Sequence, residues 1–273
     1  MKNVKPFVKW VGGKTQLLPT IREMMPTTFE RYYEPFVGGG ALFFDLKPSH
    51  AVINDINRSL ITTYKQLRVN ASLVNDQLRL LDESIAEMGE QYFYDVRKIF
   101  NEKMKKEEYD SQLAAIFIFL SKHSFNGLYR QNSHGEYNSP SNHMTGPSTP
   151  EEILIADSNV LKDTDILCMD FEEALESASH DDFVFLDSPY APLNATSFDK
   201  YTASGFSKED HERLARVFRD LDVRGCHCML TNHNTDFIRT LYHDFNMREV
   251  SVRRAINSDG AHRRGKEVII TNY

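Results

Sequence analysis

The sequence predicts a mixed α/β fold in which a helical insertion interrupts a mostly parallel sheet. Short runs rich in Val, Ile, Phe or Tyr recur near both ends of the 273-residue chain. An amphipathic helical pattern separates two of the later runs, whereas the middle of the chain shows helical spacing alone. Because alternating strands and helices are typical of parallel sheets, we expect the two ends of the chain to form the sheet together.

Six segments have the length and composition of strands. They are residues 31–36, 51–54, 183–186, 226–231, 247–252 and 267–271. A helix is predicted at residues 207–221, where Ser207 and Asp210 match a capping box. The apolar residues on one face of that helix are Leu214, Val217, Phe218 and Leu221.

The middle of the chain carries two helical signals and one long loop. Leu73, Gln77, Leu78, Leu81 and Ile85 recur at helical spacing, and residues 113–125 are a largely apolar helix candidate. Residues 126–150 are rich in Asn, Ser, Gly, Pro and His, which favour loops. A loop of about 25 residues is too long for a simple connection, so we expect function or disorder there.

The composition is that of a globular protein, with 41% hydrophobic and 26% charged residues. We find no apolar run near the roughly 20 residues of a membrane span and no signal-peptide pattern. Cys168, Cys226 and Cys228 form neither a disulfide framework nor a metal motif, and no other cluster has ligand spacing. We therefore expect a cytoplasmic protein without a metal.

The net charge of −7 argues mildly against nucleic-acid binding, but basic residues gather near the C-terminus. They are Arg248, Arg253, Arg254, Arg263, Arg264 and Lys266. The cluster is explained equally well by a phosphate-binding surface and by a solvated basic face.

A glycine turn and an acidic residue indicate a ligand site. Gly38, Gly39 and Gly40 follow the first predicted strand, and Asp55 follows the second. In a doubly wound sheet such glycines let a ligand approach the backbone, and the acid can accept hydrogen bonds from ribose hydroxyls. A tight turn without a ligand would use the same glycines.

The segment around Trp10 and Lys14 offers an aromatic face and an amine. Gly12, Gly13 and Lys14 look like the end of a phosphate-binding loop, but the first glycine of that motif is missing, so an NTPase is excluded. Trp10 and Lys14 match an amino-acid-bearing cofactor instead.

Asp187, Ser188, Pro189 and Tyr190 follow the apolar run at 183–186. Open α/β sheets place their ligands at this end of a strand, although an ordinary turn would also use Asp, Ser and Pro. Residues 9–14, 36–40, 126–140 and 187–190 together resemble the Dam/DpnII (D12 class) family of DNA adenine-N6 methyltransferases. The likeness extends from Phe7 to Tyr273.

The resemblance implies a Rossmann-like S-adenosylmethionine-dependent methyltransferase sheet with an inserted, mainly helical DNA-recognition domain. Residues 1–57 and 158–273 would form the catalytic and cofactor-binding domain, and residues 58–157 the target-recognition domain. It further implies a monomer that acts on double-stranded DNA in a bacterial cell or phage-infected host, without an obligate protein partner. The residues implied to line the S-adenosylmethionine pocket are Trp10, Lys14, Phe36, Gly38, Asp55, Asp170 and Asp187.

The reaction centre implied by the resemblance is the tetrapeptide from Asp187 to Tyr190, with Pro189 as its third member. The adenine amino group is a poor nucleophile until its lone pair leaves the ring system. Asp187 and the Ser188 carbonyl would accept its two N–H bonds, and Tyr190 would stack on the base. The target adenine must be flipped out of the duplex to reach these groups.

The DNA-binding residues implied by the resemblance are Lys9, Phe125, Asn126, Leu128, Arg130, Asn132, Pro140, Arg253, Arg254, Arg263 and Arg264. Phe125 would wedge between bases, Asn126 would bond a base, and Arg130 would pair with guanine. Leu128 and Pro140 would contact thymine, and Lys9 would contact a guanine or position the flipped adenine. The four arginines would contact phosphates.

The family precedent points to GATC as the recognition site, but residues 141–143 depart from the family pattern. No role is assigned to Tyr129, Gln131 or His134. Ser188 stands where the family usually has proline, so we expect slower but detectable methylation. Two alternatives stay open, a DNA-binding protein of this fold with weak or no catalysis and an RNA or protein amide N-methyltransferase.

Overall fold

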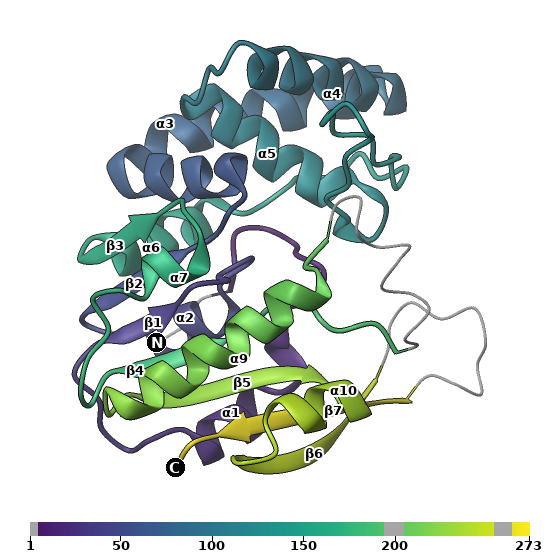
Figure 1. Ribbon diagram of the computed structural model, residues 1–273. Helices are drawn as coiled ribbons and strands as arrows, with labels where there is room; N and C mark the ends of the chain where they lie inside the picture. Colours follow the sequence, from purple (N-terminus) through teal and green to yellow (C-terminus); the bar gives the residue numbers. More distant parts are fainter. Residues whose placement is uncertain (1–4, 194–204, 254–263) are drawn as a thin grey trace. The chain divides into compact units, whose positions relative to one another are not determined.

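The computed structural model describes residues 5–193, 205–253 and 264–273 (Figure 1). These residues fall into two compact units, each assembled from segments that are distant in the sequence. Unit 1 is drawn from Met1–Thr15, Val37–Ser49 and Asn54–Met169, and unit 2 from Gln16–Phe36, His50–Ile53 and Asp170–Tyr273.

The structure confirms a mixed α/β fold with a mostly parallel sheet and a helical segment. Its strands are β1 (Tyr32–Glu34), β2 (Ala51–Asn54), β3 (Thr164–Leu167), β4 (Phe183–Leu186), β5 (His227–His233), β6 (Asn246–Arg253) and β7 (Arg264–Thr271). The strand order is β3-β2-β1-β4-β5-β7-β6. β1 pairs in parallel with β2 and β4, and β4 with β5, while β7 runs antiparallel to β5 and β6.

Strand β3 has no counterpart among the strands that the sequence predicts. It alternates buried Thr164 and Ile166 with more exposed neighbours, and it is only four residues long. Every residue of β1, β2 and β4 is buried, by contrast, which gives the near-continuous apolar runs of parallel strands.

Four described helices belong to unit 2. They are α1 (Leu18–Met24), α7 (Phe171–Ala174), α9 (Lys208–Val223) and α10 (Asp236–Leu241). The predicted helix at 207–221 is α9, which packs on β5 and runs across the strands in Figure 1. Ser207 and Asp210 form the predicted capping box, and the four predicted apolar residues are buried.

Unit 1 is mainly helical. Its helices are α2 (Ala41–Leu46), α3 (Arg58–Met88), α4 (Glu90–Lys105), α5 (Ser111–His123), η2 (Phe125–Gly127) and α6 (Glu151–Leu161). The short 3-10 helix η1 (Lys14–Gln16) begins in unit 1 and ends in unit 2. Helices α3, α4 and α5 pack against one another (Figure 1). The predicted helical spacing at 73–85 is correct, but Leu73 is exposed and Val74 takes the buried position. No helix among the described residues is long and apolar enough to span a membrane.

The long loop after η2 is ordered by contacts with α4. The Arg97 guanidinium donates to the Ser139 carbonyl at 2.9 Å. The Asn101 amide donates to the Tyr137 carbonyl at 3.0 Å and accepts from the Tyr137 amide at 2.8 Å. Backbone groups of an irregular segment therefore gain partners on a regular helix, which fixes the loop's path.

Candidate active site

The tetrapeptide from Asp187 to Tyr190 directly follows β4 and contacts side chains of the neighbouring strand β5. Leu186 pairs with Leu230 in the sheet, so the next residues, Asp187 and Thr231, lie side by side. The Thr231 hydroxyl donates to Asp187 Oδ1 at 2.7 Å. This hydrogen bond orients the carboxylate at the carboxyl end of the strand, where open α/β sheets bind ligands.

Asn232 holds the rest of the turn. Its Oδ1 accepts the Ala191 amide at 2.9 Å, and its Nδ2 lies 3.5 Å from Ser188 Oγ. Ser188 is buried, and Pro189 is exposed. The backbone after Asp187 is therefore restrained by a side chain of β5 as well as by its own sequence.

Two contacts fix the side chain of Tyr190. Its hydroxyl donates to Glu267 Oε2 on β7 at 2.8 Å, and its ring meets His233 edge-on at a centroid distance of 4.8 Å. Burial and the negative charges of Asp187 and Glu267 raise the pKa of Tyr190 well above its usual value. The phenol thus stays neutral, and its ring can serve as a rigid stacking surface.

In unit 1 the glycine turn and Asp55 contact each other directly. The Gly38 amide donates to Asp55 Oδ2 at 3.1 Å, and the Asn57 amide donates to Oδ1 at 2.9 Å. Burial raises the pKa of Asp55, while these two hydrogen bonds act in the opposite direction. A carboxylate oxygen can accept more than one hydrogen bond, so Asp55 in this fixed orientation can also accept from ribose hydroxyls.

Trp10 explains why the turn contains glycine. A Cβ atom on Gly38 would lie 2.8 Å from Trp10 Cδ1 and Nε1, and Gly38 has a φ of +47°. The indole therefore rests against the backbone of the turn, in a place that a side chain would occupy. Lys14 is 8% exposed, and its ammonium donates to the Gly12 carbonyl at 2.6 Å.

In unit 2, Phe36 and Asp170 belong to an aromatic and charged cluster with Phe171 and Arg213. The rings of Phe36 and Phe171 lie 5.3 Å apart, and the Arg213 guanidinium covers Phe171 at 4.3 Å. Arg213 binds both oxygens of Asp170, at 2.7 and 2.9 Å. This pairing lowers the pKa of Asp170. Asp170 also caps α7, so it is an oriented carboxylate beside an aromatic surface.

The predicted DNA-reading segment begins at η2 in unit 1. Phe125 is 53% exposed, as a wedging side chain must be. Asn126 adopts a left-handed backbone with a φ of +55°. A Cβ atom on Gly127 would lie 2.7 Å from Lys9 Cγ, which shows that Lys9 packs directly on this turn. Lys9, Phe125 and Asn126 are thus brought together at one place.

The other predicted DNA contacts of unit 1 have partners within the loop. Arg130 Nε donates to Asn138 Oδ1 at 2.8 Å, which orients the guanidinium. Asn132 accepts the amides of His134 and Glu136 and donates to the Glu136 carboxylate, so it shapes the loop. Leu128 is half-buried and Pro140 is exposed.

The predicted phosphate contacts are only partly within the described residues. Arg253 ends β6 and Arg264 begins β7, and the two positions are paired in the hairpin register. Arg254 and Arg263 lie outside the described residues. Lys266, further along β7, forms an ion pair with Glu249 at 2.9 Å.

Four residues of these clusters have no role in the sequence-based prediction, namely Thr231, Asn232, Glu267 and Arg213. A signal existed for the first two, because polar residues at the end of the predicted strand 226–231 belong to the same sheet edge as Asp187. Glu267 and Arg213 contact the site from distant segments, and nothing in their local sequence distinguishes them.

Comparison with known proteins gives matches over nearly the whole chain. Residues 10–256 match the family model of the D12 class N6 adenine-specific DNA methyltransferases. The chain is 40% identical to the type II methyltransferase M1.LlaDCHI of Lactococcus lactis subsp. cremoris, covering 99% of this chain and 96% of the relative. It is also 40% identical to the type II methyltransferase M.MjaIII of Methanocaldococcus jannaschii, with 99% of each chain covered. The DNA adenine methylase of Escherichia coli strain K12 is 30% identical, with 100% of this chain and 96% of the relative covered.

Proposed function

The chain belongs to the D12 class of N6 adenine-specific DNA methyltransferases, and we propose that its target adenine lies in GATC or a related short duplex site. It is therefore an adenine-specific DNA methyltransferase. Membership of this family favours that function over the two alternatives left open above, a DNA-binding protein with weak or no catalysis and an RNA or protein amide N-methyltransferase. The observation that carries the assignment of its reaction centre is the Asp187 carboxylate, held by Thr231 at the end of β4.

The methyl donor we propose is S-adenosylmethionine, whose sulfonium makes the methyl group electrophilic. Asp55 would accept hydrogen bonds from its ribose, and Trp10 would offer its indole to the methionine part. Lys14, whose ammonium donates to the Gly12 carbonyl, would bind the methionine carboxylate through its positive charge. The turn at Gly38 fits this role because it has no side chain and is fixed to Asp55.

For the adenine of the donor we propose the cluster of Phe36 and Asp170. Phe36 and Phe171 supply an aromatic surface, and the Asp170 carboxylate is an acceptor for an exocyclic amino group. Arg213 keeps Asp170 ionised and oriented through two hydrogen bonds. We propose Arg213 as a support for this subsite.

At the target base, Asp187 and the Ser188 carbonyl accept hydrogen bonds from the N6 amino group. These acceptors favour the pyramidal nitrogen and stabilise the positive charge that develops on it. The nitrogen lone pair forms the new N–C bond while the sulfur–methyl bond of the donor breaks and its electron pair stays on sulfur, so that S-adenosylhomocysteine would leave. A proton is then lost from N6 to solvent, which restores the neutral amine. Tyr190 holds the flipped base by stacking, with its hydroxyl fixed on Glu267. Pro189 follows Ser188 and restricts the backbone of the turn.

For DNA binding we propose the groups around η2 together with the β6–β7 hairpin. Phe125 enters the base stack, Asn126 binds a base edge, and Arg130 reads a guanine from the orientation set by Asn138. Leu128 and Pro140 contact thymine, Lys9 a guanine or the flipped adenine, and Asn132 keeps the loop in shape. Arg253, Arg254, Arg263 and Arg264 are proposed to contact phosphates.

The experiment measures tritium transfer from labelled S-adenosylmethionine to duplexes that contain GATC or differ from it by one base pair. We expect incorporation into adenine of the GATC duplex alone. Asp187→Ala should abolish transfer while DNA binding persists, and Asp163→Ala, at an exposed position of unit 1, serves as the matched control. Equal methylation of all duplexes would refute the GATC assignment. Full activity of Asp187→Ala would refute the reaction centre.

A further inference from the structure

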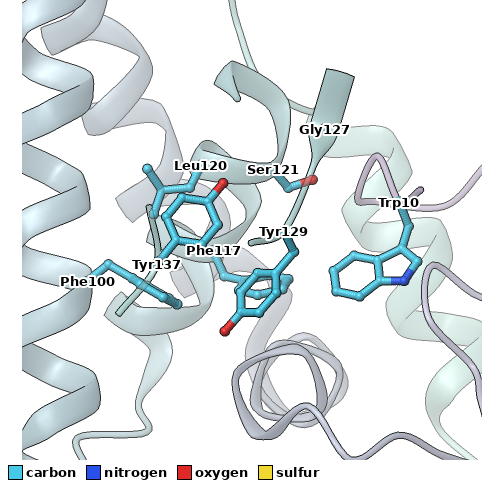
Figure 2. A pocket seen from close by; sticks show the side chains of 8 residues that line it. All are labelled: Trp10, Phe100, Phe117, Leu120, Ser121, Gly127, Tyr129 and Tyr137. Atoms are coloured by element: carbon cyan, nitrogen blue, oxygen red, sulfur yellow. The ribbon is translucent and has the colours of Figure 1, made fainter. Parts of the chain in front are cut away.

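Tyr129, a residue of the long loop without an assigned role, lies at the centre of an aromatic cluster in unit 1. Figure 2 shows it between Trp10 on one side and Tyr137 and Phe100 on the other. Its ring is stacked with Trp10 at a centroid distance of 5.9 Å and an interplanar angle of 26°. Its centroid lies 5.7 Å from that of Phe117 and 5.3 Å from that of Tyr137. Tyr129 therefore joins the loop to the indole.

Trp10 contacts the glycine turn as well as Tyr129. The Gly38 backbone approaches the indole so closely that a Cβ atom would lie 2.8 Å from two of its ring atoms. At Gly39 a Cβ atom would lie 3.0 Å from Trp10 Cβ. A change in the position of the turn must therefore move the indole or break this contact, because packed side chains leave little free space.

The hydroxyl end of Tyr129 gives a second connection to the same region. It interacts with Asn57 and Ser59 at the start of α3, and burial raises its pKa to about 12. The Asn57 amide is one of the two donors to Asp55. From the loop side, the Gln131 amide donates to the Tyr129 hydroxyl at 3.1 Å. Tyr129 thus contacts neighbours of both Gly38 and Asp55.

We propose that Tyr129 is a positioning residue that couples occupation of the cofactor site to the DNA-reading loop, through its stack on Trp10. The proposal rests on the function proposed above, in which Trp10, Gly38 and Asp55 bind the donor. Tyr129 stands between Leu128 and Arg130, which we assign to base contacts. A ligand that fixes Trp10 and the glycine turn therefore also fixes the backbone from which those two side chains project.

The test measures DNA affinity with and without S-adenosylhomocysteine, the product that cannot donate a methyl group. Binding of a labelled GATC duplex is followed by anisotropy. Trp10 is the single tryptophan of the chain, so its emission reports S-adenosylhomocysteine binding independently of activity. In the unmodified enzyme we expect S-adenosylhomocysteine to tighten duplex binding by roughly two- to tenfold. This is the change in affinity that corresponds to the interaction free energy of one aromatic pair. The duplex should tighten S-adenosylhomocysteine binding by the same factor.

Tyr129→Leu should reduce this coupling factor to near one, while its Trp10 emission still titrates with S-adenosylhomocysteine. Tyr129→Phe retains the ring and should retain the coupling. Tyr129→Met replaces the leucine variant if that variant does not fold. Tyr92→Leu removes a half-buried tyrosine of α4 that packs on Phe119, outside this cluster, and is the matched control.

Three results would overturn the coupling role. The first is an unchanged coupling factor in Tyr129→Leu, and the second is an equal loss of the coupling factor in Tyr92→Leu. The third is a duplex affinity of the unmodified enzyme that does not change when S-adenosylhomocysteine is added. In each of these cases normal methylation of GATC duplexes would leave the proposed function intact. Failure of Trp10 emission to respond to S-adenosylhomocysteine, together with no methyl transfer, would instead refute the cofactor site and the coupling with it.

Discussion

Asp157 on α6 is a buried carboxyl group whose protonation should govern the stability of unit 1. Its side chain is fully buried, and neither oxygen has a hydrogen-bond partner among the described residues. Burial raises its pKa from 3.8 to about 8, against the weaker opposing effects of the Phe7 backbone and the Lys47 charge. The folded protein therefore keeps this proton at neutral pH, whereas the unfolded chain loses it near pH 4.

The sign and size of the effect follow from this difference. Because burial raises the pKa of Asp157 in the folded protein, the contribution of its protonated form to the free energy of unfolding is fully present below about pH 4. This contribution is lost progressively as the pH rises toward 8. Each pH unit in this window lowers the free energy of unfolding by about 1.4 kcal/mol. Between pH 5 and pH 7 the loss from Asp157 alone is thus about 3 kcal/mol.

Asp157→Asn removes the titration while keeping the side-chain volume. We compare the free energy of unfolding of this variant with that of the unmodified protein. We expect the variant's value minus the unmodified value to increase by about 1.4 kcal/mol per pH unit from pH 5 to 7, and to become constant above pH 8. Urea unfolding followed by circular dichroism at several pH values measures both proteins. The slope of the difference is independent of any constant packing cost of asparagine and of the other titrating groups.

Asp163→Asn, at an exposed position just beyond α6, is the matched control and should give a difference that does not vary with pH. Parallel stability curves for Asp157→Asn and the unmodified protein would refute the reasoning. They would show that the carboxyl group is ionised in the folded state or that water reaches it.

Three further predictions concern the reaction and the loop. Thr231→Val removes the hydrogen bond that orients Asp187, so we expect kcat to fall about tenfold with little change in the KM for DNA, and steady-state kinetics would contradict this if KM alone changed. Ser188→Pro should raise the methylation rate about two- to fivefold, because proline restricts the backbone of the turn, and a lower single-turnover rate would argue that the serine is needed. Arg130→Ala should weaken binding of the GATC duplex by about 1–3 kcal/mol but hardly change binding to a duplex altered at the guanine that it reads, and a uniform loss on both duplexes would assign Arg130 to phosphate instead.

The parallel strands β2 and β4 could be predicted because they are buried and mostly apolar. Residues 183–186 and 51–54 are buried throughout, so composition alone marks them as strands. β3 carries no such signal, because Thr164 and Asp165 make up half of it. The apolar face of α3 was only partly predictable, since the exposed Leu73 and the buried Val74 are adjacent and similar in character.

The candidate site shows the same division between local and distant information. Asp187 could be placed at a strand end from its own neighbours. Its support by Thr231 depends on the register of two strands, which becomes visible only once they pair. The Arg213 pair with Asp170 joins residues 43 positions apart, and the contact of Glu267 with Tyr190 joins residues 77 apart. Such contacts depend on the three-dimensional path of the chain and leave no trace in local spacing.

The left-handed backbone at Asn126 limits how the recognition of this enzyme can evolve. A φ of +55° is strained for most side chains, and only glycine, asparagine and aspartate adopt it readily. Glycine offers no group to a base, and the aspartate carboxylate is repelled by phosphates. Asparagine is thus almost the only residue that combines this backbone with an amide for the base contact that we propose. If Asn126 binds a base in this way, new specificities would arise by substitution at Phe125, Leu128 or Arg130, around an unchanged Asn126.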